Sequence, residues 1–93
     1  MTQLRVFPWF LRNDYEFFKR ISQDDSSLPD TFEEWLEVAE KQIVEYEVNA
    51  IAIQKVVIHP HEFTAYCDAI GLNRDSVARD SFAVEVNMRV NQG

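Results

Sequence analysis

The chain has 93 residues and a formal net charge of -7, with 46% apolar residues, two Gly and three Pro. A chain of this length supports one hydrophobic core, and its composition is far from that of disordered proteins. The acidic balance excludes a simple binder of nucleic acid or of anionic membranes, because both need clustered Lys and Arg. We therefore expect one compact domain over residues 1–93, with no direct nucleic-acid binding and no membrane association.

No apolar run reaches the roughly 18 residues that cross a bilayer. Pro8 and Arg12 interrupt the apolar stretch near the N-terminus, which therefore lacks the pattern of a secretory signal. Cys67 is the only cysteine and cannot form an internal disulfide. These features predict a soluble, cytoplasmic protein whose fold does not depend on oxidation.

Residues 4–10 alternate in the manner of a short strand, and Pro8 places that strand at a sheet edge, where its missing N–H is least needed. Neighbouring side chains of an extended chain point to opposite faces, so Phe7 and Trp9 should lie opposite Phe10. Only one of these sets can face the same core, so the second face is either covered by another part of the chain or left for a partner. We therefore take Phe7, Trp9 and Phe10 as candidate partner-binding residues.

Asn13 and Glu16 have the spacing of a capping box, which predicts a first helix that ends near Ser22. Its apolar face comprises Phe17, Phe18 and Ile21. Residues 22–31 are nearly all turn formers and predict a polar, acidic loop. Leu28 is the only large apolar residue there, and we expect it to anchor the loop to the core.

Thr31 and Glu34 form a second capping box, at the start of an amphipathic helix over 31–47. At about 100° per residue, the apolar residues fall within one arc. These residues are Phe32, Trp35, Leu36, Ala39, Ile43 and Tyr46. The helix should pack this face on a small sheet.

The acidity of the chain is local. Between Asp24 and Glu47, nine acids and one base give -8, whereas the remaining seven acids and eight bases give +1. A solvated helix face explains most such rows of glutamates. We nevertheless take Glu33, Glu37 and Glu40 as candidate contacts for a basic partner, because charge complementarity guides association.

Residues 50–58 are rich in β-branched side chains and predict a strand. Pro60 suits the first position of a third helix, which Gly71 ends in a left-handed conformation. Asn73 is the expected cap of a short fourth helix over 74–81. From 82 to 90, strict alternation of Val and Met with polar residues predicts a strand, with one continuous helix as the alternative.

These elements define a small two-layer α+β domain, with three to four helices packed on a short two- or three-stranded sheet. Two strands alone make a poor sheet without a further partner. A homodimer is therefore among the expected states.

His59, His61, Glu62 and Cys67 contain the residue types of a zinc site, but their spacing does not place them on one helix face. We expect His59 to end the strand and cap the third helix, His61 and Glu62 to be solvated in the first turn of that helix, and Cys67 to lie in the core. The repeat of Arg74-Asp75-Ser76 as Arg79-Asp80-Ser81 puts the copies about 140° apart on a helix, so we interpret it as coincidental. We expect no cofactor and no obligatory metal.

A non-catalytic protein-interaction or regulatory module is the function that these features favour. It would associate with itself or with a protein partner through the aromatic N-terminal segment and the acidic helix face. Two alternatives stay open. One is an acidic inhibitor that mimics nucleic acid, and the other is a small enzyme that uses His59 and His61.

Overall fold

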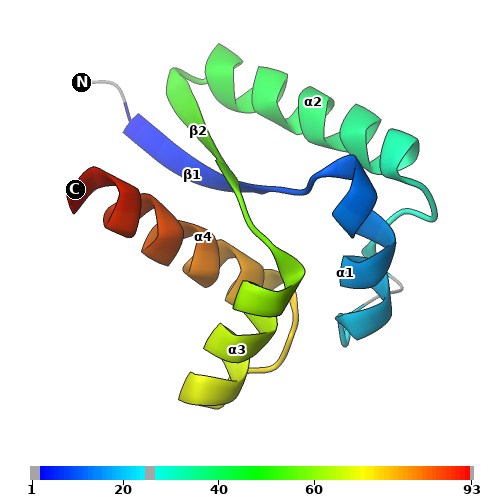
Figure 1. The fold of residues 1–93 in the computed structure, drawn as a ribbon. Helices are drawn as coiled ribbons and strands as arrows, with labels where there is room; N and C mark the ends of the chain where they lie inside the picture. Colours follow the sequence, from blue (N-terminus) through cyan, green and yellow to red (C-terminus); the bar gives the residue numbers. More distant parts are fainter. Residues whose placement is uncertain (1–2, 25–26, 93) are drawn as a thin grey trace.

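The computed structural model describes residues 3–24 and 27–92, in which four α-helices accompany two strands (Figure 1). A short 3-10 helix at Arg12–Asp14 precedes the first α-helix. In chain order the other elements are β1 (Gln3–Trp9), α1 (Tyr15–Ile21), α2 (Phe32–Val48), β2 (Ile51–Val57), α3 (Pro60–Ile70) and α4 (Ser76–Gln92). The structure confirms the predicted α+β class.

The two strands form a parallel sheet whose register runs from Gln3 opposite Ile51 to Trp9 opposite Val57. Figure 1 shows α2 on one side of the strands and α4 on the other. Parallel strands need a long crossover connection, which α1 and α2 provide. The outcome within the described residues is a two-stranded sheet, the smaller of the two predicted sizes.

The core is built largely from aromatic rings. Phe10 lies 4.9 Å from Trp35 and 4.6 Å from Phe18, measured between ring centroids. Phe63 continues the stack, 5.7 Å from Phe18 and 5.9 Å from Phe82. These contacts join β1 and α1 to α2, α3 and α4 in one continuous cluster.

The central amphipathic helix, α2, agrees with its prediction. The Thr31 hydroxyl accepts a hydrogen bond from the Glu34 backbone N–H at 3.1 Å, which caps the first turn. Trp35 and Ala39 are buried, and the glutamates of the helix are exposed. Burial of the apolar face therefore orients α2 as expected.

The C-terminal prediction was wrong, because residues 82–90 belong to the continuous helix α4. Phe82 is 1% exposed and packs with Ala78 and Ala83 in the core, at helical spacing. The alternating residues Val84 and Met88 are instead about half exposed. Val86 packs against the core four residues after Phe82, so the period of 3.6 outweighs the alternation that predicted a strand.

Two of the predicted helix starts also differ. No side-chain hydrogen bond caps α1, which follows a 3-10 turn rather than an Asn13 capping box. At α4, Asp75 Oδ1 accepts from the Ala78 backbone N–H at 3.0 Å, so Asp75 is the cap rather than Asn73. In the loop, Leu28 is buried as predicted.

Candidate functional site

Within residues 3–24 and 27–92, β1 pairs with β2 alone, so its outer edge has backbone groups without a strand partner. The Trp9 carbonyl accepts a hydrogen bond from the Ile58 N–H at 3.1 Å, so the backbone polar groups of Trp9 face β2. Successive residues of a strand alternate in direction. The N–H groups of Leu4 and Val6 therefore face outward, together with the carbonyls of Leu4, Val6 and Pro8. Pro8 has no N–H to leave unpaired at this edge, as the sequence predicted.

This edge lies in a groove between two helices. Two adjoining clefts of about 410 and 470 Å³ share Arg5, Tyr46 and Asp80 in their lining. The wall from α2 includes Val38, Gln42 and Tyr46, and the wall from α4 includes Ser76, Asp80 and Val84. The loop residues Ser27, Leu28 and Pro29 line one end. We call this site the β1 groove.

Two groups of opposite charge line the β1 groove. The Arg5 guanidinium carbon lies 5.0 Å from the centre of the Tyr46 ring, which places Arg5 on the α2 side of β1. Asp80 stands on α4. Partial desolvation raises the pKa of the Asp80 carboxyl, and the positive charges of Arg5 and Arg79 offset only part of this effect.

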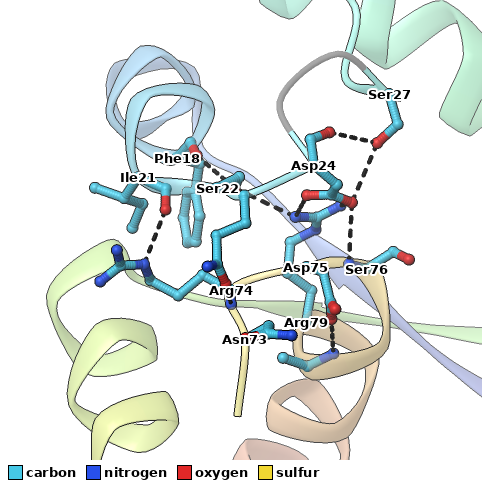
Figure 2. A network of polar contacts seen from close by, with 12 residues as sticks. Phe18, Ile21, Ser22, Asp24, Ser27, Asn73, Arg74, Asp75, Ser76 and Arg79 are labelled. Carbon is cyan, nitrogen blue, oxygen red and sulfur yellow. Dashed lines mark hydrogen bonds and ion pairs between the residues drawn. The ribbon is translucent and has the colours of Figure 1, made fainter.

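An ion pair fixes the loop at the end of the groove to α4 (Figure 2). The Arg79 guanidinium donates to both carboxylate oxygens of Asp24 at 2.9 Å, and it also donates to the Ser22 hydroxyl at 3.3 Å. Asp24 Oδ2 also accepts from the Ser76 backbone N–H, at the start of α4. Burial opposes ionisation of Asp24, but the hydrogen bonds and charge of Arg79 outweigh it and hold the pKa of Asp24 below its usual value.

Arg74 holds the same loop from a second position. Its Nε donates to the Ile21 carbonyl at 2.9 Å, and its backbone N–H donates to Gln23 Oε1 at 2.8 Å. Arg74 and Arg79 therefore contact one segment, contrary to the prediction that the repeated triplets share no surface. The helical angle did not apply, because Arg74 precedes the first residue of α4.

The structure separates the three aromatic candidates. Phe10 is 2% exposed and belongs to the core, so it offers no surface to a partner. Phe7 is half-buried and lines the β1 groove. Trp9 is also half-buried, with its ring centre 4.9 Å from that of Trp35 and 4.3 Å from Lys55 Nζ.

The acidic candidates lie on a different surface. Glu33, Glu37 and Glu40 are exposed, and at about 100° per residue they stand on the side of α2 opposite the groove wall. Glu33 accepts a hydrogen bond from Arg12, which lowers the pKa of its carboxyl. Glu37 pairs with Lys41 at 3.3 Å. The chain's own cations thus contact two of these three glutamates.

The histidines do not join the β1 groove. His59 Nδ1 lies 3.6 Å from Asp14 Oδ2, and the His61 ring stacks against Phe17 with 5.2 Å between centroids. Cys67 is fully buried, and burial raises the pKa of its thiol. Within residues 3–24 and 27–92, no three His, Cys, Asp or Glu side chains come together as metal ligands.

Sequence reasoning missed the groove because its walls come from distant elements. Two signals were present. The alternation that faces Pro8 outward also faces Leu4 and Val6 outward, and Asp80 belongs to the repeated triplet that was set aside. Neither signal indicates which helices flank the strand edge, so residue spacing alone could not predict the groove.

The site and the fold define a small α+β domain with an open strand edge in a helix-walled groove. Residues 10–92 match the family described as "Domain of unknown function (DUF8829)", and the chain belongs to this family. The match begins directly after β1. No curated protein and no solved structure gives a significant match. None of the described helices combines the length and apolar character needed to cross a membrane.

Proposed function

We propose that this domain is a non-catalytic protein-interaction module that binds an extended polypeptide segment along the outer edge of β1. The observation that carries the proposal is the row of outward backbone groups in the β1 groove, which are the N–H groups of Leu4 and Val6 and the carbonyls of Leu4, Val6 and Pro8. An added peptide strand forms main-chain hydrogen bonds with such groups, which give affinity. The pockets beside the strand bind its side chains and give sequence specificity. No reactive group is required.

The groove also supplies apolar contacts on both walls. Val38 is 46% exposed on α2, Val84 is 45% exposed on α4, and Leu4 is 62% exposed on β1. Alternate side chains of an added strand point to opposite walls, so each wall can receive one set. We take β1 rather than β2 as the receiving edge, because residues of β1 line both clefts, whereas Ile51 is the one residue of β2 that lines either.

The acidic face of α2 has a secondary role in this proposal. Its charge attracts a basic partner over a distance of about 8 to 10 Å at physiological salt, without direct contact in the groove. Mimicry of nucleic acid has less support, because Glu33 and Glu37 already pair with Arg12 and Lys41.

A paired substitution tests the strand-addition site. Leu4→Pro removes an outward N–H and the leucine side chain, whereas Leu4→Ala removes only the side chain. The N–H of Leu4 does not bond to β2, so both variants should keep the β1–β2 ladder. We expect 12-residue peptides selected against the wild type from a random display library to bind Leu4→Pro at least fivefold more weakly than Leu4→Ala, as about 1 kcal/mol per lost hydrogen bond implies.

Amide NMR spectra of the same variants show where the peptides bind. The Leu4 and Val6 N–H signals should shift on peptide addition to the wild type. Selected peptides that bind Leu4→Pro and Leu4→Ala equally well, or that leave both amide signals unmoved, would contradict the proposal.

A further inference from the structure

The two walls of the β1 groove differ in chemistry. Arg5 faces α2 and stacks over Tyr46. Neighbouring residues of a strand point to opposite sides, so Leu4 and Val6 point away from Arg5 and toward α4. Asp80 and Val84 of α4 line one cleft together with Leu4 and Val6, and Arg5 and Tyr46 line its other side. A strand added to β1 therefore presents one set of side chains to Asp80 and the other set to Arg5 and Tyr46.

Asp80 lacks a close cation among the described residues. No side-chain nitrogen of a described Lys, Arg or His lies within 4.0 Å of the Asp80 carboxylate. The neighbouring Arg79 forms its ion pair with Asp24 instead. The groove around Asp80 includes the apolar side chains of Leu4 and Val84. Closure of the groove by a peptide would desolvate this carboxylate further, which costs free energy unless the peptide supplies a positive charge.

A second copy of this chain fits the edge poorly. An antiparallel pairing that bonds both the N–H and the carbonyl of Leu4 to those of Val6 in the second copy brings the two Arg5 residues directly opposite each other. Like charges in opposite positions are destabilising. A shift by two residues sets Leu4 opposite Pro8 of the second copy, which has no N–H to donate.

From these observations we infer that the partner is an extended segment of another protein, with a Lys or Arg side chain that points to α4 and pairs with Asp80. The inference rests on the proposed function, because it assumes strand addition at β1. The residues next to this Lys or Arg point to α2. There Arg5 and Tyr46 favour an acidic or aromatic side chain.

Charge reversal at Asp80 tests the inference directly. Random 12-residue peptide libraries are selected against the wild type, Asp80→Lys and Asp80→Asn, with Asp68→Lys on the exposed surface of α3 as the matched control. We expect wild type and Asp68→Lys to enrich one Lys or Arg position within an alternating apolar pattern. Asp80→Lys should enrich Asp or Glu at that position, and Asp80→Asn should show no charge preference.

A double-mutant cycle with one selected peptide gives the size of the effect. Replacing its conserved Lys or Arg by Ala should weaken binding to the wild type about fivefold and leave binding to Asp80→Asn unchanged. Fluorescence anisotropy in 150 mM salt measures each affinity. The difference should shrink in 1 M salt, because the pair is partly exposed to solvent.

The outcomes separate the two proposals. Peptides that lose binding in Leu4→Pro but show no basic preference, or keep the same preference with Asp80→Lys, overturn this inference and leave strand addition standing. Failure of the wild type to enrich any peptide sensitive to Leu4→Pro overturns both. A dimer in analytical ultracentrifugation that Leu4→Pro converts to monomer would assign the groove to a second copy and also overturn the inference.

Discussion

Replacement of Asp24 by Asn should destabilise the domain strongly. The Arg79 side chain is 6% exposed, and its two terminal nitrogens donate to the two carboxylate oxygens of Asp24 at 2.9 Å. An amide offers one acceptor oxygen in place of two, and it carries no charge. Asp24→Asn therefore leaves a buried guanidinium charge without its counter-ion.

The size of the effect follows from burial. Removing one member of a fully buried ion pair costs about 3 to 5 kcal/mol. The Asp24 side chain is 24% exposed, so water compensates part of this loss and we expect about 2 to 3 kcal/mol. The free energy of unfolding of a domain this size is about 5 to 14 kcal/mol, so the change is a large fraction of the total.

The pH dependence should change as well. Because the folded-state pKa of Asp24 is below its usual value, its contribution is complete above the unfolded pKa of about 3.9 and disappears as the pH falls through the folded pKa. Asp24→Asn should lack this part of the acid destabilisation. The difference in unfolding free energy between wild type and variant should therefore be larger at pH 7 than at pH 3.

Urea denaturation followed by tryptophan fluorescence at both pH values measures these differences. Asp30→Asn is the matched control, because the Asp30 side chain is 89% exposed and lies 3.4 Å from Lys19. We expect little change from that substitution. Our reasoning about the Arg79 ion pair is refuted if Asp24→Asn costs no more than Asp30→Asn at pH 7.

Other substitutions test the fold. Phe82→Ala should lower the free energy of unfolding by about 3 to 5 kcal/mol and Val84→Ala by less than about 0.5 kcal/mol, since only Phe82 is buried; equal losses in urea denaturation would contradict the helical face. Gly71 and Ala50 have positive φ values of 72° and 62°, a backbone conformation that glycine adopts more easily than alanine. In thermal unfolding, Gly71→Ala should therefore destabilise the domain by about 1 kcal/mol and Ala50→Gly should stabilise it by about 0.5 kcal/mol. Burial raises the pKa of Tyr15 to about 12, so ultraviolet titration should show a late tyrosine ionisation that Tyr15→Phe removes. The stability from this neutral hydroxyl is complete below pH 10 and is lost as the pH rises toward 12.

The sequence predicted those elements whose signals are local. The Thr31 cap, the buried face around Trp35, the strand predicted over 50–58 and the left-handed stop at Gly71 each depend on residues within a few positions of one another. These signals agree with the tertiary structure, so the predictions for α2, β2 and α3 were confirmed. The prediction of a strand over 82–90 was wrong because the helical period of 3.6 and the strand period of 2 are both present there. Only contacts with the core distinguish the two periods.

The groove and its supporting ion pair depend on long-range contacts. Asp24 and Arg79 are 55 positions apart, and no periodic pattern links them. Phe10 was proposed as a surface residue because its burial depends on how β1 meets Phe18 and Trp35. Reasoning from the sequence therefore found the strand and its edge character, but not the helices that turn this edge into a groove.

The parallel pairing of β1 with β2 affects how the chain is made. Gln3 pairs with Ile51, 48 positions later, so β1 leaves the ribosome roughly 2 to 10 seconds before its partner strand at ordinary rates of synthesis. During this interval both edges of β1 lack a partner. The nascent chain thus exposes an unpaired strand before the helices that later flank it exist, and pairing with β2 then covers only one of its two edges.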